Sequence, residues 1–167
     1  LLLAAKAIIW LLIGVLAVAG IFIALGIPAS FFLAGEIYTE IDLSEVPPQT
    51  TWLIALLLAM IAGTIYMGIR FFRNMLAIVN SVCEGDPFVP ANGDRLTIMA
   101  WLMLAINLMT LPIGGLVYYI TTLVGDQIEE QSFGMDFGGI VLILTLFILA
   151  RVFRKGTEMR EDLEGTV

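Results

Sequence analysis

The chain has 167 residues, of which 60% are hydrophobic and only 14% are charged. Soluble domains carry about 25% charged residues, so a water-soluble fold of this size could not bury so much apolar surface. The formal net charge is −7, and the absence of His with a single Cys, Cys83, excludes disulfide frameworks, His-based catalysis and Cys/His metal sites.

Four apolar stretches are long enough, or nearly so, to cross a bilayer as helices. They cover residues 7–34, 52–72, 96–124 and 137–153. A helix needs about 20 residues to cross a hydrocarbon core, and backbone groups cannot stay unpaired in lipid. The sequence therefore predicts an all-α integral membrane protein, a four-transmembrane-helix bundle that forms one domain over residues 1–167.

The first apolar run resembles a signal peptide over residues 1–27. It is too long for the apolar region of a signal peptide, and it has no clear small-residue cleavage site. We therefore expect a retained helix. Because the chain begins at Leu1 without Met, we also expect further residues before it in the natural protein.

The basic residues indicate how the spans are oriented. Loops 35–51 and 125–136 contain acidic residues and no basic ones. Basic residues are retained on the cytoplasmic side of a membrane. We therefore expect both termini, the loop 73–95 and the tail 154–167 in the cytoplasm, and the two acidic loops outside. All eight basic residues lie at the predicted cytoplasmic ends: Lys6, Arg70, Arg73, Arg95, Arg151, Arg154, Lys155 and Arg160.

Small residues indicate how the helices pack, because helices in lipid associate through close contacts and a few polar groups. The second span carries Ala55, Ala59 and Gly63 at a spacing of four, and the third carries Asn107 and Gly114 on one stripe. We expect Gly63, Asn107 and Gly114 in the bundle interior. The alternative for the second-span face is that it pairs two protomers in a homo-oligomer.

The second span keeps helical periodicity beyond its apolar part. We expect that helix to extend into the cytoplasm as far as about Glu84, as the fourth helix also does. Gly85 suits the residue after a helix end, because it tolerates a left-handed backbone. Asp86 and Pro87 then begin a turn.

Three residues after this turn have predicted roles. We expect Phe88 to be tucked against the helices, with a partner contact as the alternative. Asn92 or Asp94 can cap the third span by accepting from its free N–H groups.

The tail combines bases next to the membrane with acids farther away. Arg151, Arg154 and Lys155 form a basic cuff at the bilayer surface, and Glu158 and Asp162 belong to the acids that follow. The simple interpretation is anchoring followed by a solvated end. The functional interpretation is that the acids dock on a basic cytoplasmic partner.

Two motifs resemble the pattern of a bacterial family, domain-of-unknown-function family 2975. The first is EGDPF at residues 84–88, followed by Asn92 and Arg95-Leu96. The second is VFRKG at residues 152–156, followed by acids and a final Thr166-Val167. The chain departs from the family pattern at Arg151, where an acid is common. The resemblance implies a four-span membrane protein, and family members are often encoded beside a small helix-turn-helix regulator of the Cro type.

The resemblance and the dense motifs favour a non-enzymatic, regulatory protein of the bacterial inner membrane. We expect it to bind a cytoplasmic partner, a small helix-turn-helix regulator, through the middle loop and the tail. No cofactor, metal site or direct nucleic-acid contact is predicted, since no nucleotide-binding glycine motif and no extended basic surface occur. The candidate partner-binding residues are Glu84, Gly85, Asp86, Pro87, Phe88, Asn92, Arg95, Arg154, Gly156, Glu158 and Asp162.

Two other functions remain open. The acidic outward loops would suit a receptor or immunity protein that meets a cationic peptide. A carrier of a lipophilic molecule would need a cavity lined by Asn107, Thr110 and the segments near Pro28 and Pro112.

Overall fold

The structure is a computed structural model that describes residues 2–40, 49–124 and 137–164, with side chains over 2–32, 49–124 and 137–163. Four α-helices make up nearly all of these residues: α1 (Leu2–Glu40), α2 (Gln49–Cys83), α3 (Pro90–Val124) and α4 (Phe137–Glu164). Each is long and apolar enough to cross a membrane. The predicted all-α class with four membrane-spanning helices is confirmed, and within the described ranges the structure contains no strand.

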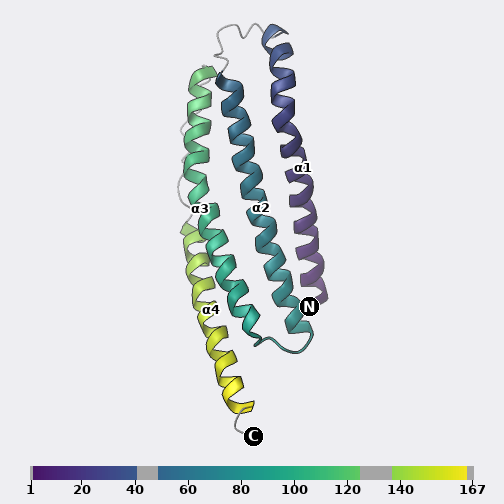
Figure 1. The fold of residues 1–167 in the computed structure, drawn as a ribbon, viewed down its shortest axis with the longest axis vertical. Coiled ribbons are helices and arrows are strands. Elements are labelled where there is room, and N and C mark those ends of the chain that lie inside the picture. Colours follow the sequence, from purple (N-terminus) through teal and green to yellow (C-terminus); the bar gives the residue numbers. More distant parts are fainter. Residues whose placement is uncertain (1, 41–48, 125–136, 165–167) are drawn as a thin grey trace.

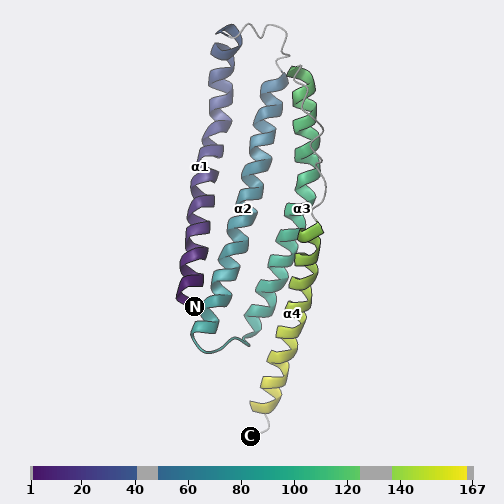
Figure 2. The same ribbon diagram turned by 180° about the vertical axis from the view of Figure 1, so that it is seen from behind.

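The helices stand side by side in chain order. α1 packs on α2, α2 on α3, and α3 on α4 (Figure 1 and Figure 2). Among the described residues, α1 makes no contact with α3 or α4. The bundle is therefore an open row whose two outer helices present most of their surface outward, which suits a surrounding bilayer.

α4 is shifted along the direction of its helix axis relative to α3. Its first turn lies beside the middle of α3, where Gly139 meets Asn107, and its later turns lie beside the start of α3, where Arg154 crosses Gly93. In consequence α4 continues past the other helices at the end where α2 and α3 are connected (Figure 1). The predicted extension of α2 and α4 beyond their apolar runs is confirmed by their ends at Cys83 and Glu164.

The largest cluster of buried apolar residues lies toward one end of the helices, where α3 packs on both α2 and α4. We call it the basic end, because it carries Arg70, Arg73, Arg95, Arg151 and Arg154. Leu96, Met99 and Ala100 of α3 pack there on Leu146 and Ala150 of α4. Phe71, Met75, Phe147 and Phe153 are among the side chains that cover this cluster.

The contact between α1 and α2 uses glycines outside the predicted stripe of small residues. A Cβ at Gly20 would lie 3.3 Å from Ile65, and one at Gly68 would lie 3.5 Å from Leu16, so these two glycines face the neighbouring helix. At the other end of these two helices, away from the basic end, the rings of Phe31 and Trp52 meet edge to face with their centroids 4.8 Å apart.

Gly63 differs from its predicted interior position. It is exposed, and no described atom of a neighbouring helix lies within 4 Å of where its Cβ would be. Ala59 is exposed as well, whereas Ala55 is buried. Asn107 and Gly114 are both buried on α3. The stripe of small residues on α2 therefore faces mainly outward, because α1 and α3 pack on other faces of that helix.

Candidate functional site

The connection between α2 and α3 begins with a complete helix-ending motif. The N–H of Asp86 donates to the carbonyl of Ser81 at 3.1 Å, and the N–H of Gly85 donates to that of Val82 at 3.2 Å. Gly85 has φ of 87°, a left-handed backbone that glycine adopts without steric cost. This pair of bonds is the Schellman motif, which satisfies carbonyls left free at a helix end. The chain consequently turns sharply and runs toward α4.

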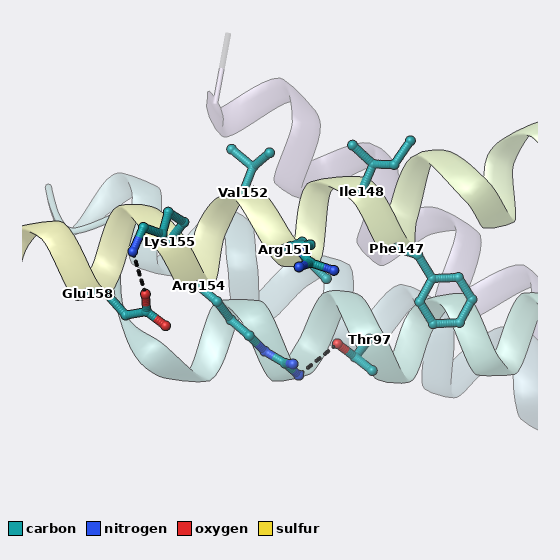
Figure 3. A pocket seen from close by; sticks show the side chains of 9 residues that line it. Thr97, Phe147, Ile148, Arg151, Val152, Arg154, Lys155 and Glu158 are labelled. Carbon is teal, nitrogen blue, oxygen red and sulfur yellow. Dashed lines mark hydrogen bonds and ion pairs between the residues drawn. The ribbon is translucent and has the colours of Figure 1, made fainter.

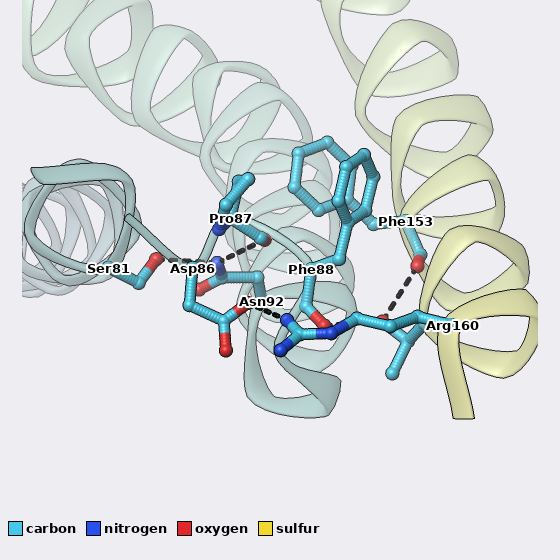
Figure 4. A network of polar contacts seen from close by, with 8 residues as sticks. Ser81, Asp86, Pro87, Phe88, Asn92, Phe153 and Arg160 are labelled. Carbon is cyan, nitrogen blue, oxygen red and sulfur yellow. Dashed lines mark hydrogen bonds and ion pairs between the residues drawn. The ribbon is translucent and has the colours of Figure 1, made fainter. Parts of the chain in front are cut away.

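Asn92 ties this turn to the end of α2. Its side chain is fully buried, and its Nδ2 donates to Ser81 Oγ at 2.6 Å and to the carbonyl of Pro87 at 2.9 Å (Figure 4). Its Oδ1 accepts from Arg95 at 2.8 Å. Ser81 in turn donates to the carbonyl of Ile78 at 2.8 Å. The carboxamide therefore uses both hydrogens and its oxygen in one network, which is the condition for burying a polar group cheaply.

The prediction that Asn92 or Asp94 caps the third span is wrong. α3 begins at Pro90, so both residues lie inside the helix. Proline suits a first helical turn because it has no N–H to leave unpaired. Asn92 is thereby released from capping and connects α2, the turn and α3.

Phe88 connects the turn to α4. Its ring lies 5.5 Å from that of Phe153, and a Cβ at Gly156 would lie 2.8 Å from two of its ring atoms. The buried hydroxyl of Thr157 lies 3.2 Å from the Phe88 carbonyl and 3.0 Å from that of Phe153. Phe88 is thus packed against the helices as predicted, although 41% of it stays exposed.

Two ion pairs join the same segments at their surface. Arg154 donates to Asp94 at 3.2 Å and to Thr97 at 3.1 Å, and Arg160 pairs with Asp86 (Figure 4). The side chains of Arg154 and Asp94 are 54% and 71% exposed. Exposed pairs of this kind contribute about 0–1 kcal/mol each. The packing of Phe88 on Gly156 and the bond between the buried Thr157 hydroxyl and the Phe88 carbonyl therefore hold the two segments together more than the charges do.

We call residues 84–95 together with 153–163 the loop–tail surface. The structure brings together nearly all of the candidate partner-binding residues, and several of them contact one another or other residues of the chain: Asp86, Phe88, Asn92, Arg95, Arg154 and Gly156. Glu84 is exposed, and Glu158 pairs with Lys155 of its own helix at 3.0 Å. Some candidate residues therefore pack within the chain, whereas others on the same surface are exposed to a partner.

Sequence reasoning missed several residues on which this surface depends. Ser81, Thr157 and Phe153 supply contacts described above, and Gly93 lets the stem of Arg154 cross it, since a Cβ there would lie 2.7 Å from Arg154 Cγ. A glycine inside a helix costs about 1 kcal/mol relative to alanine. A glycine at 93 or 156, inside a helix, therefore indicates a close contact with another segment, which the lengths of the apolar runs do not indicate.

The outermost part of α4 displays apolar side chains. Met159 and Leu163, one turn apart, are 57% and 72% exposed. The same stretch of helix carries the acidic residues Glu158, Glu161 and Asp162 and the basic Arg160, which pairs with Asp86. This extension combines apolar and acidic groups beyond the ends of the other helices.

The acidic outward loops 35–51 and 125–136 lie mostly outside the described residues. Of the first, the helical backbone is described as far as Glu40 and the chain again from Gln49; of the second, no residue is described. The receptor prediction that depends on these acids therefore stays a prediction.

A comparison with known protein families finds a match. The sequence profile of a family described as "Protein of unknown function (DUF2975)" matches residues 33–167, which is more than half of the chain. No curated protein and no solved structure matches the chain.

Proposed function

The chain belongs to the DUF2975 family, and from that premise we propose that it is a non-enzymatic regulatory protein of the bacterial inner membrane that binds a cytoplasmic partner through its loop–tail surface. The partner class that the motif resemblance implies is a small helix-turn-helix transcription regulator. The proposal places both termini and the loop–tail surface in the cytoplasm, since all eight basic residues lie on one side of the predicted spans.

The observation that carries the proposal is the exposed apolar pair on the α4 extension. Met159 and Leu163 lie about two and a half and three and a half turns beyond Ala150, so we expect them to lie outside the hydrocarbon core. Anchors at positions i and i+4 are the usual way in which an amphipathic helix enters a groove of a partner. The acids around this pair suit a partner groove with a basic rim, which DNA-binding proteins commonly possess.

The packed part of the loop–tail surface has a supporting role in this proposal. Phe88 and Asn92 bind α4 and α2, so the turn positions the α4 extension relative to the membrane helices. A partner would meet a helix whose direction these contacts already set. A helix that is ordered before binding loses less conformational entropy on association.

Photo-crosslinking in cells tests the proposal. A photoreactive residue at Met159 should capture a small soluble protein that mass spectrometry identifies. The same residue at Ile148, which is 66% exposed but lies within the apolar run, should capture no soluble protein. Capture of only lipid or of the chain itself at Met159 would contradict the proposal.

A binding measurement then locates the surface. With the captured partner and the purified chain, Leu163→Glu should weaken binding about tenfold, since a buried apolar anchor contributes more than 1 kcal/mol. Arg73→Gln, which changes an exposed charge on α2, should leave affinity unchanged.

The carrier alternative has less support. Asn107 packs against Gly139, whose Cβ would lie 2.7 Å from Asn107 Oδ1, so this carboxamide fills the space between α3 and α4. Thr110 is exposed and donates to the carbonyl of Asn107 at 2.6 Å. These two residues are therefore occupied by contacts within α3 and with α4.

A further inference from the structure

A groove of about 910 Å³ runs along α4 and the start of α3 at the basic end. Its lining changes in character along α4. Phe147 and Ile148 supply an apolar part, and Arg151, Arg154 and Lys155 supply a basic part in which Val152 also lies (Figure 3). Thr97 of α3 and the carboxylate of Glu158 also line it. The groove is thus an amphipathic surface at the level where the apolar run of α4 ends.

The three cations of the groove differ in how far they are already neutralised. Arg154 pairs with Asp94 and Thr97, and Lys155 pairs with Glu158 at 3.0 Å. Arg151 is exposed and, within the described part of the chain, makes no hydrogen bond or ion pair. Figure 3 shows its guanidinium between the side chains of Phe147 and Arg154. Since the two pairs are exposed and therefore weak, the groove keeps a net positive character that is centred on Arg151.

We infer that this groove binds an anionic phospholipid, with the phosphate at Arg151 and an acyl chain along Phe147 and Ile148. The order of the lining residues matches the order of groups in such a lipid. Phe147 and Ile148 belong to the apolar run. Arg151 is the first charged residue after that run, and Lys155 lies one turn farther out. Basic pockets between membrane helices at the bilayer surface recognise lipid head groups in this manner.

The inference does not depend on the proposed partner. It needs only that α3 and α4 cross a membrane and that the groove lies at a bilayer surface, whichever side that is. The groove and the loop–tail surface adjoin each other, because Arg154 belongs to both. A bound phosphate near Arg154 would share that guanidinium with Asp94.

Native mass spectrometry of the purified full chain in micelles tests the inference. The probes are phosphatidylglycerol and phosphatidylcholine with identical acyl chains, and the variants are Arg151→Gln, Arg151→Lys and Lys6→Gln. Lys6→Gln removes the same charge from α1, which makes no described contact with α4. Because Arg151 has no polar partner among the described residues, its replacement should leave the fold intact, and circular dichroism checks this.

The wild-type chain should bind phosphatidylglycerol more tightly than phosphatidylcholine. Arg151→Gln should lower the affinity for phosphatidylglycerol about fivefold, which corresponds to about 1 kcal/mol per basic residue at a membrane surface. Arg151→Lys and Lys6→Gln should stay close to the wild type.

Three results would overturn the inference. The first is equal retention of the two lipids, and the second is an equal loss with Arg151→Gln and Lys6→Gln. The third comes from a competition with glycerol phosphate. If this soluble phosphate binds as tightly as the lipid, the groove is a site for free phosphate and the acyl chain has no part in it.

Discussion

The ring of Phe88 lies so close to the backbone of Gly156 that a Cβ at 156 would come within 2.8 Å of ring atoms Cδ1 and Cε1. Real Cβ atoms essentially never come this close, so any side chain at 156 must displace the ring. The ring has Phe153 as its other neighbour, at 5.5 Å. One turn residue and one helical glycine thus define how the connection between α2 and α3 meets α4.

Gly156→Ala should destabilise the chain. Overpacking costs about 1–3 kcal/mol, whereas alanine in a helix gains about 1 kcal/mol over glycine, so we expect a net loss of about 1–2 kcal/mol in the free energy of unfolding. Reversible unfolding in mixed micelles measures it. In a Phe88→Ala background the same substitution should cost nothing, and equal costs in both backgrounds would show that the ring is not the cause.

Gly139→Ala should weaken the contact between α3 and α4. The new methyl group would meet the Asn107 carboxamide, which is 4% exposed and has little room to move. We expect a loss of about 1–3 kcal/mol in the free energy of unfolding. Gly115→Ala is the matched control, because none of the described neighbouring atoms lies within 4 Å of its Cβ position. Gly115→Ala should be neutral or stabilising, and similar losses for both variants would contradict the proposed packing.

Asn92→Ala should loosen the turn between α2 and α3. It removes three hydrogen bonds from a fully buried position and leaves Ser81 and Arg95 without this partner. We expect a cost of about 1–3 kcal/mol. Hydrogen exchange of residues 84–89 should accelerate. Asn74→Ala, which loses only an exposed bond to the carbonyl of Arg70, should change neither quantity.

Gly85→Ala should strain the end of α2. Its φ of 87° lies in the left-handed region, where a Cβ costs about 1–2 kcal/mol. Space is not the cause, since no atom lies within 4 Å of the Cβ position. Gly85→Asn should therefore recover part of the lost thermal stability, because Asn tolerates this conformation. A full loss with Asn would point to another cause.

Cys83 gives a direct test of the predicted orientation. It is exposed at the end of α2, on the side that the basic residues assign to the cytoplasm. A membrane-impermeant maleimide should label it only after the cells are permeabilised. A Cys83→Ala chain that carries Ser132→Cys should give the opposite pattern, because the sequence assigns residue 132 to an outward loop. Labelling of Cys83 in intact cells would reverse the assignment.

The sequence by itself determined the four spans, the extension of α2 and α4 and the helix end at Gly85. Each of these depends on local properties, namely the length of an apolar run and the conformational range of glycine. Tertiary structure alone decided which faces meet. In a bilayer the outward face of a helix is as apolar as the inward face, so helical periodicity does not separate them.

For that reason Gly63 is exposed while Gly139 packs against the side chain of Asn107, although both are glycines within apolar spans. For the same reason Asn92 binds α2 and the turn instead of capping a helix. The displacement of α4 along α3 follows from contacts between residues that are tens of positions apart. No local pattern contains that information, since it depends on how two separate apolar surfaces fit together.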